Sequence, residues 1–196
     1  ANLPGLKRDF KGFDLSAHRR FDGGHRLQIT YSHGDLYGNT QVGNVASVTG
    51  KNTGFAQIPS LRQDYRSPQY DALLNESLRH AFKAFGSAAL PGGVELSGSF
   101  LRRSGMHYSS LTKTSGDLVL TPGTTRGAFE LPWVSSLDLA LSHSFRIQQV
   151  TWRSTLECYN VTNHQPMTLI NNVAGAFTAG NYQQPRVWQM SVRASF

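Results

Sequence analysis

Alternation of apolar and polar residues is the feature that most constrains how this chain folds. In the final segment, Arg186–Phe196, every second side chain from Trp188 to Phe196 is apolar and those between are polar. Because successive side chains of a β-strand point to opposite faces of the sheet, this pattern predicts a strand with one apolar and one polar face. Segments of about ten residues are also long enough to cross a bilayer as tilted strands.

Six earlier segments alternate in the same way, some more clearly than others. They are Lys11–Phe21, His25–His33, Arg79–Leu90, Val94–Arg103, Ser135–Phe145 and Val150–Cys158. Three connections between segments are short, at Asp22–Gly24, Pro91–Gly93 and Arg146–Gln149, whereas the others are long and polar. Short turns on one side and long loops on the other are typical of a transmembrane β-barrel. A soluble β-sandwich does not need this asymmetry.

Turn and aromatic residues agree with that arrangement. Asp22-Gly23-Gly24 predicts a tight hairpin, because glycine readily adopts the positive φ angles that such turns need. Phe21, Phe145 and Phe196 all fall at the short-turn side of their strands, as an aromatic girdle at a membrane interface requires. The alternative is that these rings fill the core of a soluble protein.

Composition favours the all-β class. Hydrophobic residues make up 39% of the chain, no apolar stretch is long enough for a membrane-spanning helix, and 19 glycines suit many turns. We therefore predict an antiparallel transmembrane β-barrel segment of about seven strands, with short periplasmic turns and long extracellular loops, in the bacterial outer membrane.

Several other functions find no support. The net charge of +7 comes from scattered Lys and Arg residues without a dense basic run, so we expect no nucleic-acid partner. A basic surface suits anionic lipid head groups or an acidic ligand. Cys158 has no partner for a disulfide and is expected to serve packing.

The chain also lacks catalytic motifs, so we expect no enzyme activity and no cofactor. The histidines are too dispersed for a typical metal site and are expected to be polar wall or loop residues. They are His18, His25, His33, His80, His107, His143 and His164.

The ending RVWQMSVRASF resembles the C-terminal signal of outer-membrane proteins, which the barrel-assembly machinery recognises. It would be carried by Trp188, Met190, Val192, Ala194 and Phe196. More of the chain resembles the Oar-like TonB-dependent receptors, which carry a carboxypeptidase-regulatory-like domain before the plug. The similar stretches are FKGFDLSAHRRF, LLNESLRHAFKAFGSAALPGG, FLRRSGMHYS, LECYNVTNHQPM and PRVWQMSVRASF.

That resemblance implies a plugged barrel of about 22 strands. Residues 1–196 would be its C-terminal portion. The plug, the N-terminal strands and the segment that engages the energy-coupling protein would lie outside this chain. A fragment, a portion of a longer polypeptide and one part of a split barrel all remain open. A small barrel of eight strands would need one more strand, for which GDLVLTP is the only candidate.

Charged residues on the predicted strands are expected to point into the barrel lumen. They are Asp14, Arg20, Arg26, Glu95, Arg103, Asp138, Arg153, Glu157 and Arg193. They would form either a self-neutralised wall, which bonds to water or to a plug, or a path for cargo. Candidate ligand-binding residues in the first long loop, about Gly34 to Ser77, mix aromatic and polar groups. Those we single out are Tyr37, Phe55, Tyr65, Arg66 and Tyr70.

Two functions follow as hypotheses. The first is part of a TonB-dependent transporter that binds a nutrient at its outer loops and passes it through the barrel. Its partners would be outer-membrane lipid and lipopolysaccharide, the remaining barrel and plug, the assembly machinery and the energy-coupling protein. The second is a structural or adhesive barrel whose long loops bind another protein.

Overall fold

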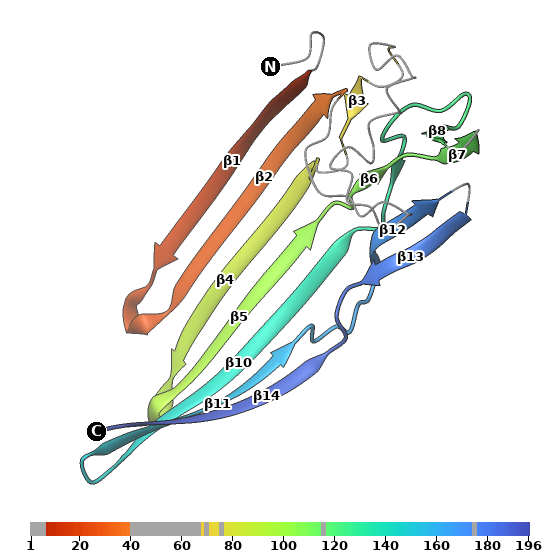
Figure 1. Ribbon diagram of the computed structural model, residues 1–196. Helices are drawn as coiled ribbons and strands as arrows, with labels where there is room; N and C mark the ends of the chain where they lie inside the picture. The colour runs from red at the N-terminus through yellow and green to blue at the C-terminus, as the bar shows by residue number, and fades with distance from the viewer. Residues whose placement is uncertain (1–6, 40–67, 69–70, 75–76, 115–116, 174–175) are drawn as a thin grey trace.

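Seven long antiparallel strands form one large sheet in the computed structural model (Figure 1). The structure describes residues 7–39, 68, 71–74, 77–114, 117–173 and 176–196. The long strands are β1 (Arg8–Arg20), β2 (Arg26–Gly38), β4 (His80–Leu90), β5 (Val94–Arg103), β10 (Val134–Ile147), β11 (Val150–Tyr159) and β14 (Val187–Ser195). They pair in chain order, and this confirms the prediction of an all-β antiparallel protein with seven long strands.

The sheet is not closed into a barrel. Among the described residues, β1 pairs only with β2 and β14 pairs only with β11, so both have a free edge. A short strand, β3 (Ala72–Leu73), extends the sheet beside the end of β2. No helix in the described part of the chain is long and apolar enough to cross a membrane.

Glycine-containing turns join the long strands at one end of the sheet. Two short 3₁₀ turns, Asp22–Gly24 and Pro91–Gly93, hold glycines with positive φ, including Gly23 at 80° and Gly92 at 76°. The third hairpin links β10 to β11 through Gln148, whose φ is 55°. The predicted turn at Asp22–Gly24 is therefore confirmed, together with its positive φ angles.

Strand register separates most polar from most apolar side chains of the sheet, with exceptions such as Phe85 on the polar side and Arg102 on the apolar side. One row of paired residues runs through Arg26, Ser87, Ser97, Ala140, Glu157 and Gln189. Rows of the opposite parity run through Ile29, Ala84, Phe100 and Leu137, and through Leu141, Leu156 and Met190. We call the side with the first row the polar face and the other the apolar face. The period-two pattern of the sequence predicted both faces.

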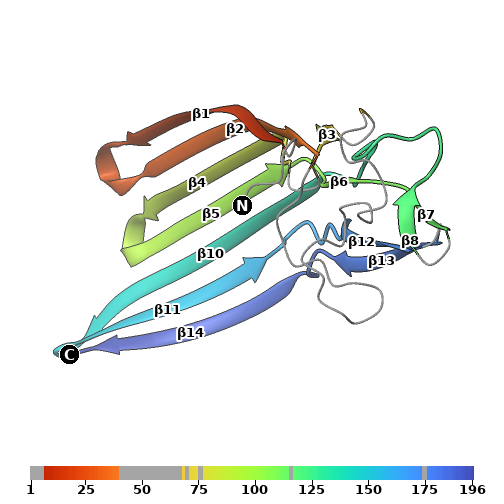
Figure 2. The same cartoon turned by 45° about the horizontal axis from the view of Figure 1, so that its top comes forward.

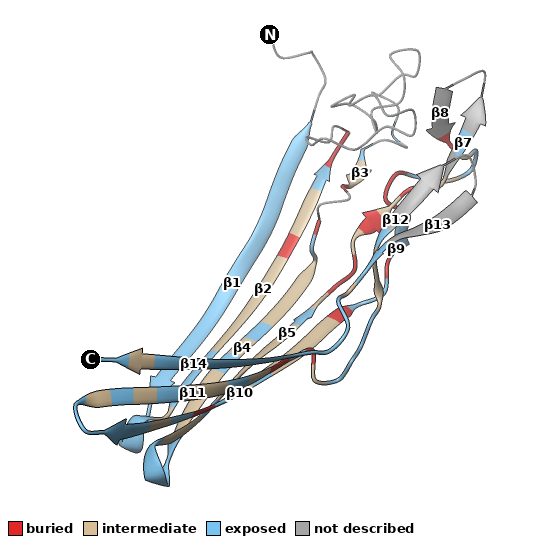
Figure 3. Cartoon of the chain, turned by 60° about the horizontal axis from the view of Figure 1, so that its bottom comes forward, coloured by how far each residue is buried: buried red, intermediate tan, exposed pale blue. Residues whose placement is uncertain are grey.

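Most of the apolar face is covered by no part of the chain that the structure describes. Leu15 is 62% exposed, Trp188 62% and Met190 72%. The buried side chains lie instead mainly at the long-loop end (Figure 3), and they include Leu74, Leu131 and Val134 as well as several polar groups. The packed interior of the described chain therefore belongs largely to its loops and not to its seven-stranded sheet.

Short strands structure the loops at that end (Figure 2). They form three two-stranded sheets: β6 (His107–Tyr108) with β9 (Phe129–Glu130), β7 (Leu111–Thr114) with β8 (Asp117–Leu120), and β12 (Met167–Val173) with β13 (Ala176–Tyr182). All six lie within segments that the sequence predicted as long loops. The GDLVLTP segment does form a strand, β8, but it pairs with β7 and does not join the main sheet as an eighth barrel strand.

Candidate functional site on the polar face

The nine charged residues expected in the lumen all lie at polar-face positions. Arg20 is the cross-strand partner of Arg26, Asp138 of Ser99, and Arg153 of Arg193. The other four also point to the polar side of the sheet, as their cross-strand partners show. These pairs are Asp14 with Ser32, Glu95 with Ser142, Arg103 with Val134 and Glu157 with Ala140. One side of the sheet therefore carries all nine.

An ion pair joins two of these residues across three strands. The Arg153 guanidinium on β11 donates to the Glu95 carboxylate on β5 at 2.8 Å, reaching over β10. In the described part of the chain no other ion pair joins two of the nine. The structure thus brings Glu95 and Arg153 together and leaves the other seven without an oppositely charged partner among themselves.

Small side chains leave a hollow in the middle of the polar face. Ser87, Ser97, Ser99 and Ala140 form its floor, and its volume is about 590 Å³. Because serine and alanine are short, the longer side chains on either side of this floor rise above it. Four of the predicted residues line this common space: Arg20, Arg26, Asp138 and Glu157.

Charges of opposite sign flank the floor. Arg20 and Arg26 lie on β1 and β2 on one side, together with His18, and Asp138 and Glu157 lie on β10 and β11 on the other. Like charges that face each other directly across two strands repel, so the Arg20–Arg26 pair favours an anionic partner between them. No acidic side chain of the described chain makes an ion pair with either arginine.

Neutral groups fix the acidic side of the hollow. The Asp138 carboxylate accepts hydrogen bonds from the Ser136 hydroxyl at 2.9 Å, the Ser99 hydroxyl at 3.3 Å and the Asn160 backbone N–H at 2.8 Å. These donors are neutral, so they hold the carboxylate in place without pairing its charge. A cationic group entering the hollow would meet a carboxylate that is already oriented.

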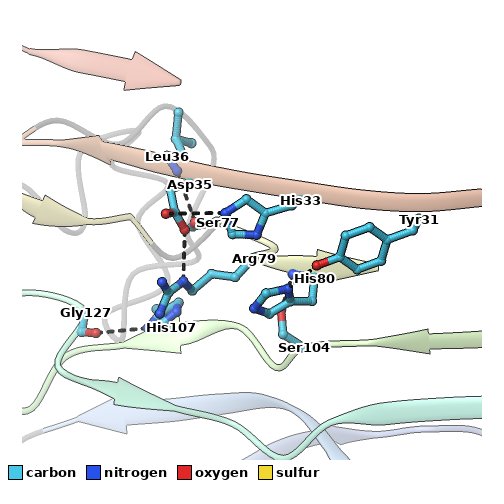
Figure 4. Close-up of polar contacts among 10 residues, drawn as sticks. All are labelled: Tyr31, His33, Asp35, Leu36, Ser77, Arg79, His80, Ser104, His107 and Gly127. Atoms are coloured by element: carbon cyan, nitrogen blue, oxygen red, sulfur yellow. Dashed lines mark hydrogen bonds and ion pairs between the residues drawn. The ribbon is translucent and has the colours of Figure 1, made fainter. Parts of the chain in front are cut away.

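A second cluster, on the apolar face near the long-loop end, was missed in the sequence. His33 and His80 are cross-strand partners, with ring centroids 4.9 Å apart. His80 Nδ1 bonds to the Tyr31 hydroxyl at 2.8 Å (Figure 4), and its ring stacks on Trp133 at 5.8 Å. Arg102 lies over the other ring of this stack, 5.3 Å from the Trp133 centroid.

The histidines are spread out along the sequence, but the fold brings this pair together. The two residues are distant in sequence, and only the β2–β4 register places them side by side. Asp35 lies next to His33 and accepts a hydrogen bond from Arg79 at 2.9 Å. The described residues contain no group of three or more His, Cys, Asp or Glu that could hold a metal ion.

The remaining predicted residues fall into three groups. Tyr37 lies within β2, which extends farther than predicted, so it is not a loop residue. Phe55, Tyr65, Arg66 and Tyr70 lie outside the described residues. The five residues of the expected assembly signal alternate along β14 and just beyond it, with Trp188, Met190 and Ala194 paired to Cys158, Leu156 and Trp152 on the apolar face.

Comparisons with known proteins add no relative. No protein-family model matches the chain, and no curated protein or solved structure matches it significantly.

Proposed function

We propose that this sheet is part of the wall of an outer-membrane β-barrel, and that the barrel is a TonB-dependent transporter. The observation that carries the proposal is the continuous apolar face, which spans seven strands and is covered by no part of the described chain. Exposed apolar patches beyond a few hundred Å² are rare on soluble monomers and mark contact with a membrane or a partner.

Lipid is the cover that fits this face best. The seven strands run side by side and have the length that a tilted membrane strand needs, about 9 to 11 residues. Each of the five inner strands pairs with a neighbour on both sides, as backbone in a bilayer must. The aromatic and histidine cluster around Trp133 lies near the long-loop end of the same face, where an interfacial belt would lie.

Further strands would have to close the barrel. A free strand edge exposes unpaired N–H and C=O groups, which are costly in lipid, so the free edges of β1 and β14 need partners. We propose that these strands belong to the rest of the barrel, in the same polypeptide or in a partner chain. The assembly machinery would bind the β14 end, and a plug would carry the contact with the energy-coupling protein.

Transport is favoured over a purely structural barrel by the polar face. A barrel that serves only as an anchor needs a polar interior but no particular distribution of charge. Here the polar face has a hollow with basic groups on one side and acidic groups on the other. The resemblance of FKGFDLSAHRRF and the other stretches to Oar-like receptors points the same way.

The denatured mass of the polypeptide that carries this C-terminus tests the transporter assignment. An antibody raised against residues 184–196 would detect it in a purified outer-membrane fraction. We expect a mass on the order of 100 kDa, the scale of a plugged barrel of about 22 strands. A mass near 21.6 kDa would contradict a single-chain transporter, and absence from the outer-membrane fraction would contradict the barrel itself.

A further inference from the structure

The hollow on the polar face separates positive from negative charge over a short span. Arg20 and Arg26 are on adjacent strands at one side, and Asp138 and Glu157 are on adjacent strands at the other. Between them lie β4 and β5, which contribute the Phe85 ring and the short side chains Ser87, Ser97 and Ser99. A ligand that fits this surface carries an anionic group at one end and a cationic group at the other.

The distribution of counter-charges sharpens this requirement. Glu95 and Arg153 neutralise each other just outside the hollow, at 2.8 Å. The arginines and carboxylates inside it have no such ion pair among the described residues. Ionised groups gain most from a partner that brings the opposite charge and hydrogen-bonding geometry, as a carboxylate does for a guanidinium.

Strand spacing sets the length of the ligand. Adjacent strands are about 4.8 Å apart, so β2 is roughly 14 Å from β10 and roughly 19 Å from β11 along the sheet. The long side chains that reach inward from both sides shorten the gap. An extended peptide covers at most about 3.3–3.6 Å per residue, so the two charged termini of three to five residues are roughly 10 to 18 Å apart.

We propose that this hollow binds a short peptide with free termini, its carboxylate at Arg20 and Arg26 and its ammonium group at Asp138 and Glu157. The hydroxyls of Ser87 and Ser97 are available to bond the peptide backbone, whereas the Ser99 hydroxyl already donates to Asp138. The small size of these three residues leaves room for varied side chains. The inference deepens the proposed transport function and rests on it: peptides of three to five residues would be the cargo, and the hollow would be a station on their path.

Binding to end-blocked peptides tests the proposal without any substitution in the protein. The full-length protein that carries this chain, purified in detergent, is titrated calorimetrically with tetraalanine, its N-acetyl form, its C-amide and the doubly blocked form. We expect saturable binding of tetraalanine and a loss of affinity of about tenfold or more for each blocked end, because each block removes a charge-assisted contact.

Two variants assign the ends. The Arg26→Gln variant should bind tetraalanine more weakly, and its affinities for the free acid and the C-amide should differ less than those of the unsubstituted protein. For the Glu157→Gln variant, the affinities for the free amine and the N-acetyl form should differ less. Arg193→Gln and Asp14→Asn alter charges on the same face outside the hollow and should leave affinity within about twofold.

Two results would overturn the peptide assignment. One is equal affinity for free and doubly blocked tetraalanine. The other is no detectable binding at peptide concentrations up to about 10 mM, which would mean a binding free energy smaller than about 3 kcal/mol. The second result is also expected if a plug segment fills the hollow permanently. Neither depends on membrane insertion or on the mass of the polypeptide, so failure here is distinguishable from failure of the proposed transport function.

Discussion

Arg153 on β11 and Glu95 on β5 form an ion pair at 2.8 Å that crosses over the intervening strand β10. The ion pair links β5 and β11 on the polar face, and the backbone ladders link both strands to β10 between them. Because Arg153 also faces Arg193 directly across the β11–β14 pair, Glu95 offsets a repulsion between two cations.

Reversal of one charge in this pair should destabilise the sheet, and reversal of both should restore it. The two side chains are 47% and 40% exposed, so the pair itself contributes no more than about 1 kcal/mol. We expect Glu95→Arg to lower the free energy of unfolding by about 1 kcal/mol, since three arginines then lie close together. Urea unfolding of the refolded protein measures this. Failure of Glu95→Arg/Arg153→Glu to recover stability would show that the pair is not energetically coupled.

Glycines beneath the Phe10 ring should not tolerate alanine. Gly12 and Gly34 are cross-strand partners, and the ring lies over both of them. A Cβ at Gly12 would be 2.5 Å from the backbone oxygen of His33 and 2.8 Å from the Phe10 ring. We expect Gly12→Ala to cost about 1–3 kcal/mol in stability, because the backbone must shift.

Gly86→Ala is the matched control, since a Cβ there would make only ordinary contacts at 3.5 Å or more. It should be neutral or slightly stabilising, because alanine restricts the unfolded chain. Equal destabilisation by both substitutions would mean that close packing under Phe10 does not limit residue 12.

The Tyr31 hydroxyl should contribute to stability through its bond to His80. Tyr31→Phe removes this hydrogen bond of 2.8 Å and leaves the ring contacts in place. A loss of about 0.5–1.5 kcal/mol is expected in thermal or urea unfolding. Tyr37→Phe on the same strand is the control, because the Tyr37 hydroxyl has no hydrogen-bond partner among the described residues. If the two variants lose the same stability, the bond to His80 contributes nothing specific.

Cys158 should react with thiol reagents only after unfolding. It is 5% exposed, and its cross-strand partners are Leu139 and Trp188. We expect negligible maleimide labelling of the folded protein and complete labelling in denaturant, followed by mass spectrometry. Rapid labelling of the folded protein would show that this part of the apolar face opens to water.

The long strands were predictable because their signal is local and strict. Most have one face mainly of apolar residues and one mainly of polar residues, and a shift of one residue would reverse them, so the sequence specifies both strand and face. Gly23 and Gly92 mark the hairpin turns for an equally local reason, their positive φ. Observed strand ends differ from the predicted ones most at β2, which continues through Tyr37 to Gly38.

Contacts between strands distant in sequence were not predictable in the same way. His33 and His80 meet only because the β2–β4 register aligns them, and that register depends on pairing across a long loop. Likewise, the hollow needs β1, β2, β10 and β11 to be placed together before Arg26 and Glu157 face a common space. Strands as short as β6 and β9 have too few residues to show a period.

Solvent and oxygen accessibility along β14 tests the central claim that one face of the sheet contacts lipid. Spin labels would be placed singly at residues 188 to 193 of the full-length protein reconstituted in vesicles, with Cys158→Ser as background. The account predicts alternation: labels at Trp188, Met190 and Val192 collide with oxygen in the bilayer, whereas labels at Gln189, Ser191 and Arg193 collide with a water-soluble nickel complex. Equal access of the nickel complex to both sets, or protection of the apolar set from both reagents, would contradict a lipid-facing sheet.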